Sequence, residues 1–317
     1  MSYFIGFIKK FWLILFLLSS LLFILHYFIY QVGQLPEQIG FAWKILLITI
    51  FINVIYWVVA TLIWKYLLLS VFGVNISGFQ SFSQLVLVSM GKYIPGKIWG
   101  MVARGTQLRQ FGLKMNSLVI VTVQEQILLL HASAVVSAIF MGLLMKTDWA
   151  WGLTGLALLS LLLGKHLQQI FFGLYEQLMK LLKRNFLLDD KPIITSFQYI
   201  SLLGAYMMIW LLIGCVFGSL YFVFIAPNDF NLKIMLWMIL ANTVGTTIGF
   251  FAFFAPGGIG VRESVSSAIL LIVIPLESAI LISLLFRLWV VFTELTLGII
   301  VGYILGKKSL QNLFYQR

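Results

Sequence analysis

Charge is scarce in this chain, and its scarcity excludes a water-soluble fold. Of 317 residues, 10% are Asp, Glu, Lys or Arg, whereas 62% are hydrophobic. Soluble domains carry about 25% charged residues, and no polar stretch here is long enough to fold as a separate soluble domain. We therefore predict an all-α polytopic membrane protein, with a single transmembrane domain over residues 1–317.

Cysteine and histidine are also scarce. Cys215 is the one cysteine, which excludes a disulfide framework and a cysteine metal cluster. The three histidines lack ligand-like spacing, and no nucleophile–base pair or ATP-binding GxxxxGK[ST] loop is visible. We predict no metal and no cofactor, and a transporter instead of an enzyme. An intramembrane enzyme acting on lipid, with catalytic partners remote in sequence, stays open.

Acidic residues are half as numerous as basic ones, 10 against 21, and the net charge is +11. The basic residues lie between apolar segments, where they set orientation and meet anionic headgroups, so we predict no nucleic-acid partner. With the N-terminus in the cytoplasm, the outer side keeps Lys44, Lys146 and Lys233. We predict a multi-pass protein of the cell inner (cytoplasmic) membrane with both termini cytoplasmic.

What the chain has in abundance is long apolar runs. A crossing needs about 20 such residues, and about six full spans can be identified. They are residues 11–30, 43–66, 116–145, 147–164, 196–225 and 277–304, the first a retained signal anchor. Residues 165–185 place apolar side chains at helical spacing with basic residues on the other faces. That pattern predicts a cytoplasmic amphipathic helix at the membrane surface.

Two further apolar regions are broken in the middle by proline and glycine. Residues 75–114 contain "GKYIPGKIWG" and residues 231–276 contain "APGGIG". The count of basic residues requires each region to enter and leave on one side, the first from the cytoplasm and the second from outside. Both are therefore predicted re-entrant hairpins. Each half then has two spans, a hairpin and a span in opposite topology, which predicts an inverted repeat with halves 1–146 and 147–306.

Broken backbone at membrane depth must lie within protein or line a wet cavity. Free N–H groups at helix ends there, with nearby cations, suit an anionic lipid headgroup. The predicted substrate-binding residues are Lys92, Pro95, Gly96, Lys97, Arg104, Pro256, Gly257, Gly258, Arg262 and Arg287. The alternative for the basic cluster from Lys92 to Lys114 is that it extends to phosphates of the inner leaflet.

Three acidic residues fall in or beside membrane-depth segments, where charge is costly. Glu125, Glu263 and Glu294 are predicted to balance charge or to couple transport to protons. Arg287 and Glu294 are seven residues apart, about 10 Å along a helix, which is too far for direct pairing. Each is therefore predicted either to find a partner on the hairpins, Arg287 with Glu263 for instance, or to face water and substrate. A purely structural ion pair holding the last span to the second hairpin is the alternative.

Four stretches resemble the lysylphosphatidylglycerol synthase transmembrane family, which includes the flippase part of the bacterial multiple peptide resistance factor. They are "GKYIPGKIWGMVAR", "VQEQ", "APGGIGVRE" and "LLFRLWVVFTE", and the likeness covers roughly residues 40–305. The resemblance implies a flippase that moves an anionic phospholipid, a glycolipid or a polyprenyl-phosphate-linked lipid between leaflets. The synthases add a soluble aminoacyl-transferase domain that the sequence to Arg317 does not contain, so we expect no synthesis of lysylphosphatidylglycerol.

A second class of function stays open, that of a non-transporting scaffold for an enzyme of cell-envelope glycan or lipid assembly. The expected partners are membrane lipids with anionic headgroups. A second copy of the chain or a cell-envelope biosynthesis enzyme is compatible with the sequence as well. A hydrated cavity between the hairpins would favour transport, and hairpins packed shut by apolar side chains would favour a scaffold.

Overall fold

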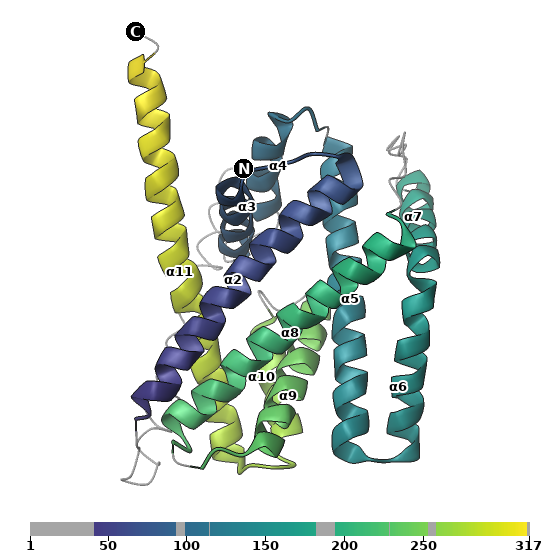
Figure 1. Cartoon of the computed structure of the whole chain (residues 1–317), viewed down its shortest axis with the longest axis vertical. Coiled ribbons are helices and arrows are strands. Elements are labelled where there is room, and N and C mark those ends of the chain that lie inside the picture. Colours follow the sequence, from purple (N-terminus) through teal and green to yellow (C-terminus); the bar gives the residue numbers. More distant parts are fainter. Residues whose placement is uncertain are drawn as a thin grey trace, which may run out of the picture.

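The computed structural model describes residues 41–92, 99–113, 115–181, 194–227, 229–252 and 258–315, and regular structure in these ranges is entirely helical (Figure 1). The predicted all-α class is thus confirmed there, while the predicted first span, residues 11–30, lies outside them. The helices are α2 (Trp43–Phe72), α3 (Gly78–Gly91), α4 (Trp99–Arg109), α5 (Met115–Met145), α6 (Asp148–Ser160), α7 (Gly164–Leu181), α8 (Ser196–Phe224), α9 (Leu232–Phe251), α10 (Val261–Leu270) and α11 (Leu276–Tyr315).

Short polar signals determine where several helices begin. The Ser77 hydroxyl accepts from the Gln80 backbone N–H while the Gln80 side chain accepts from Ser77, a capping box at the start of α3. Thr195 and Gln198 repeat this arrangement at α8. Asn231 accepts from two backbone N–H groups of α9. These caps satisfy backbone donors that would otherwise lack partners at the helix ends.

Five described helices are long and apolar enough to cross a membrane: α2, α5, α8, α9 and α11. Helix α6 and the start of α7 are together apolar enough to count as a sixth crossing, but these two segments are bent by 75° where they meet. The chain is therefore a multi-pass membrane protein. The predicted fourth span, residues 147–164, is the 13-residue α6 followed by a three-residue 3₁₀ turn, Leu161–Leu163. Alone it is shorter than the roughly 20 residues of a usual crossing.

The two broken regions form packed helix pairs of different proportions. We call α3 with α4 the first hairpin and α9 with α10 the second hairpin; in each, the two helices pack against each other. The first has arms of 14 and 11 residues. The second has arms of 20 and 10 residues, so its first arm is by itself long enough to span. The two helix pairs therefore differ in arm length.

Glycine allows both hairpins to close tightly. A Cβ on Gly100 would lie 2.6 Å from the Val88 Cα, so α4 approaches the backbone of α3. Gly258 has φ +71° and a Cβ there would lie 2.8 Å from the Gly249 carbonyl oxygen. Such close backbone approaches exclude any side chain. The glycines of the two motifs thus bring the arms of each hairpin together.

Helix α8 joins two hydrophobic cores. One contains Trp64, Leu67 and Leu68 of α2 against Tyr199 and Leu202 of α8. The other packs the far end of α8 against α9, α10 and α11, with Phe217 and Phe286 in ring contact. In Figure 1, α2 lies along α8, α5 and α6 run side by side, and the C-terminal end of α11 extends beyond the other helices. Helix α8 therefore packs directly against α2, α5, α9 and α11.

Candidate functional site

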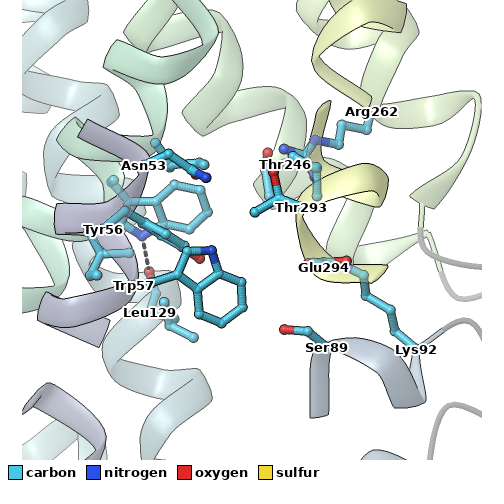
Figure 2. Close-up of a pocket in the computed structure, with 14 residues that line it drawn as sticks. Asn53, Tyr56, Trp57, Ser89, Lys92, Leu129, Thr246, Arg262, Thr293 and Glu294 are labelled. Carbon is cyan, nitrogen blue, oxygen red and sulfur yellow. Dashed lines mark hydrogen bonds and ion pairs between the residues drawn. The ribbon is translucent and has the colours of Figure 1, made fainter. Parts of the chain in front are cut away.

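A cavity of about 250 Å³ lies where α2, α3, α5, α8, α9, α10 and α11 meet. Figure 2 shows Asn53, Tyr56, Trp57 and Leu129 on one side and Thr246, Arg262, Thr293 and Glu294 across from them. Its lining is Asn53, Tyr56, Trp57, Ser89, Lys92, Leu129, Ile209, Trp210, Ile213, Thr246, Arg262, Val290, Thr293 and Glu294. Three predicted site residues, Lys92, Arg262 and Glu294, come together here.

Lys92 and Glu294 form an ion pair at this cavity. The Lys92 Nζ donates to the Glu294 Oε1 at 2.6 Å, although the two residues are 202 positions apart. The Lys92 side chain is 33% exposed and that of Glu294 is 9% exposed. Lys92 follows α3 of the first hairpin and Glu294 lies on α11. The prediction that Glu294 finds its partner on a hairpin is confirmed, and the pair joins the two halves of the chain.

Arg262 brings a second positive charge to the cavity. Its Nη2 donates to the Asn242 Oδ1 at 3.2 Å, and its guanidinium lies 5.3 Å from the centre of the Phe286 ring. Among the described residues, no carboxylate lies within ion-pair distance of Arg262. The lining thus carries two cations and one carboxylate. A guanidinium that is not paired with a carboxylate can bind phosphate through paired N–H donors.

Uncharged polar side chains complete the lining, and the sequence argument did not identify them. Within the part of the chain that the structure describes, the Thr246 hydroxyl is buried without a hydrogen-bond partner. Asn53 and Tyr56 come from α2 and face Arg262 and Thr246 across the cavity in Figure 2. An i, i+3 pair shares a helix face. Asparagine in an apolar span, followed by tyrosine three residues later, is the signal that would have identified this face.

Glu263 and Arg287 lie beside Arg262 and line a smaller space together with Asn242 and Ser266. The Arg287 Nε is 4.0 Å from the Glu263 Oε1, so the predicted pairing is confirmed at the outer limit of an ion pair. The other Glu263 oxygen accepts from the Gly260 backbone N–H at 2.7 Å. Glu263 therefore caps the start of α10, next to the break, and compensates the charge of Arg287.

Arg104 and Glu125 form a separate, enclosed pair. The Arg104 Nη1 donates to the Glu125 Oε2 at 2.7 Å, and the Arg104 side chain is 2% exposed. The guanidinium lies over the Trp64 ring, 3.8 Å from its centre. Neither charged residue lines the cavity. The structure thus places Arg104, predicted as a headgroup ligand, in contact with a carboxylate and an indole ring.

The remaining predicted site residues are placed as follows. Pro95, Gly96, Lys97, Pro256 and Gly257 lie outside the described residues. Gly258 is described, buried, and adopts the left-handed conformation at the closure of the second hairpin. Its contribution there is to backbone geometry. In the described ranges, no group of three or more His, Cys, Asp or Glu side chains is placed to hold a metal ion.

Comparison with protein families agrees with the resemblance found in the sequence. No curated protein and no solved structure matches the chain. The family model described as the lysylphosphatidylglycerol synthase TM region matches residues 10–298. This range contains both hairpins and every residue that lines the cavity, and the family indicates a membrane domain in lipid-related transport or synthesis. The chain belongs to the lysylphosphatidylglycerol synthase transmembrane region family.

Proposed function

We propose that the protein is a lipid translocase of the cytoplasmic membrane, which moves a lipid with an anionic headgroup between the leaflets through the central cavity. The headgroup would be a phosphate that binds Arg262, with Lys92 and the hydroxyl groups of the lining as further donors. Anionic phospholipids, phosphate-containing glycolipids and polyprenyl phosphates share this chemistry. The protein would act by binding and release, without making or breaking a covalent bond.

Arg262 is the observation that carries this proposal. It lines the cavity, donates to the neutral Asn242 and has no carboxylate within ion-pair distance among the described residues. A cation in such surroundings is costly unless an anion arrives. A phosphate oxygen supplies that anion, and bidentate contact with guanidinium adds geometric selectivity.

The arrangement of the hairpins supports transport over a scaffold role. The cavity lies between the end of α3 and the start of α10, the helices next to the two breaks. In each half, a hairpin is followed by a long helix that it contacts through opposite charges, Arg104 with Glu125 and Glu263 with Arg287. We propose that the halves form an inverted repeat with both termini cytoplasmic. Such repeats bind their substrate at the repeat interface and alternate its access to the two sides.

Translocation in liposomes tests the proposal. The protein is reconstituted with fluorescent phosphatidylglycerol, and the fraction of label accessible to an external quencher is followed with and without a pH difference. Wild type should translocate faster than empty vesicles. Arg262→Gln should be slower by about tenfold to a hundredfold, because a hydrogen bond to a charged group contributes about 1.5–3 kcal/mol.

Lys233→Gln is the matched control. It removes one positive charge from an exposed position at the start of the neighbouring helix α9, outside the cavity. It should leave the rate unchanged, and Arg262→Lys should give an intermediate rate because it keeps the charge but not the planar donors. Equal rates for Arg262→Gln and wild type, or wild type equal to empty vesicles for every anionic lipid tried, would overturn the proposal.

A further inference from the structure

A second, apolar space adjoins the cavity. It measures about 480 Å³ and lies between α2, α3 and α11. Besides the residues shared with the cavity, its lining includes Val54, Val58 and Leu62 of α2 and Phe79 and Phe82 of α3. We call this space the side groove. Asn53, Trp57 and Thr293 line both the side groove and the cavity, so the two spaces adjoin at these side chains.

The side groove opens on the outer surface of the bundle. Val54, Val58 and Leu62 are 55%, 53% and 58% exposed, although all three are aliphatic. They recur at i, i+4 and i+8 along one face of α2, a helix long and apolar enough to span. In a membrane, this face contacts lipid chains. The side groove therefore lies between the hydrocarbon of the bilayer and a cavity that carries positive charge.

The length of the side groove fits a hydrocarbon chain. From Asn53 to Leu62 the α2 axis rises about 14 Å, at about 1.5 Å per residue. This is close to half of the roughly 30 Å hydrocarbon core, which is the depth that one leaflet's chains occupy. The polar end of this path is Asn53 at the cavity. The distal end is aliphatic and aromatic apart from Thr61, whose hydroxyl donates to the Trp57 carbonyl oxygen within α2. That gradient matches an amphiphile with its headgroup at Arg262.

We propose that the side groove holds one hydrocarbon chain of the lipid whose phosphate occupies the central cavity. This inference rests on the proposed function and narrows its substrate class to lipids, because a water-soluble phosphate compound has no group for the side groove. The headgroup crosses through the protein while the chain stays in contact with the bilayer. No apolar chain then has to enter the charged cavity.

The side groove should orient the chain more than it increases affinity. Lipid chains leave an environment as apolar as the side groove itself, so burial there releases little free energy. The side groove instead determines the position of the chain, because Trp57 and Thr293 lie where the side groove adjoins the cavity. An obstructed side groove should therefore change where a bound chain lies and how fast the lipid moves.

Photolabelling in reconstituted vesicles tests this inference. Phosphatidylglycerol with a diazirine in one acyl chain is activated by light, and the labelled peptides are mapped by mass spectrometry. Wild type should label α2 between residues 54 and 62 and α3 between 78 and 82 above other lipid-facing surfaces. Phosphatidylcholine with the same chain should not show this preference. Val58→Trp should abolish it, because the indole fills the side groove, and Leu62→Trp should do the same if Val58→Trp fails to fold.

Leu47→Trp is the control. Leu47 lies on the same helix, is 65% exposed and does not line the side groove, so its variant should label as wild type does. Labelling spread evenly over lipid-facing helices, or preserved in both groove variants, would overturn the inference. If wild type labels in the side groove but does not translocate lipid, the inference stands and the translocase proposal fails. If translocation depends on Arg262 but the side groove is not labelled, the translocase proposal stands and the inference about the side groove fails.

Discussion

The two hairpins each contact the following helix through opposite charges, but with different geometry. In the first, Arg104 on α4 donates to Glu125 on α5 at 2.7 Å. In the second the signs are exchanged, and Arg287 on α11 lies 4.0 Å from Glu263 on α10. The first pair is enclosed by Trp64 and lies away from the cavity. The second adjoins Arg262, which faces the cavity.

This difference indicates that the charged residues of the two hairpins have different roles. Arg104 has its carboxylate and an indole ring, so its charge is compensated within the first hairpin and its neighbours. Glu263 binds the Gly260 N–H and lies near Arg287, while the adjacent Arg262 has no carboxylate within ion-pair distance among the described residues. The first pair anchors a hairpin. The second pair lies beside Arg262, whose cation faces the cavity.

The largest expected effect comes from breaking the enclosed pair. Glu125→Gln leaves Arg104 buried opposite a neutral group, which should cost about 3–5 kcal/mol of stability. Glu263→Gln keeps an acceptor for the Gly260 N–H and loses a longer contact, so it should cost about 1 kcal/mol. The free energy of unfolding, measured by denaturant titration in bicelles, checks both values.

A double variant separates charge from shape in this test. Arg104→Met with Glu125→Leu removes both charges together, and apolar replacement of a buried pair is often neutral or stabilising. The double variant should recover most of the stability lost in Glu125→Gln. Equal losses for Glu125→Gln and Glu263→Gln would remove the distinction between the anchoring pair and the pair beside Arg262.

Glycine substitution tests whether both hairpins depend on close backbone contact. Gly100→Ala brings a methyl group to 2.6 Å from the Val88 Cα, and Gly258→Ala to 2.8 Å from the Gly249 oxygen. Each should cost about 1–3 kcal/mol by overpacking. Gly258→Ala should cost the more, because φ +71° also disfavours alanine.

Gly78→Ala is the control in the same unfolding measurement. No heavy atom lies within 4 Å of a Cβ at that position, which is the first residue of α3. Stability should stay the same or rise slightly, since alanine has the higher helix propensity. If Gly100→Ala is as harmless as this control, the first hairpin does not need its close approach.

The sequence predicted the charged contacts of α11 better than the lining of the cavity. The seven-residue spacing of Arg287 and Glu294 required separate partners, and the structure supplies Glu263 and Lys92. The sequence argument did not identify Asn53 and Tyr56 as lining residues, because the sequence does not show which helix an uncharged polar residue of a span packs against. That information lies in the packing of α2 against distant parts of the chain.

Helix α9 forms the first part of the broken region 231–276 and is by itself long enough to span, which the sequence argument did not identify. Of the five helices that qualify as spans, α9 has the lowest hydropathy, 1.6. Its polar residues include Thr243 and Thr247, whose hydroxyls donate to the Ile239 and Thr243 carbonyl oxygens at 2.8 Å. Hydrogen bonds within the helix thus satisfy side chains that a hydropathy count treats as unfavourable.

The smallest expected effect on stability, but an informative one, concerns the pair that joins the halves. Lys92 is one-third exposed, so Lys92→Gln should change the free energy of unfolding by less than about 1 kcal/mol.

If the halves move against each other during transport, the Lys92–Glu294 contact must separate, and its loss should favour an opened cavity. In a Cys215→Ala background, Ser89→Cys places a thiol in the cavity lining. Adding Lys92→Gln should speed the alkylation of this thiol by a water-soluble maleimide. An unchanged rate would indicate that the Lys92–Glu294 pair does not separate during transport.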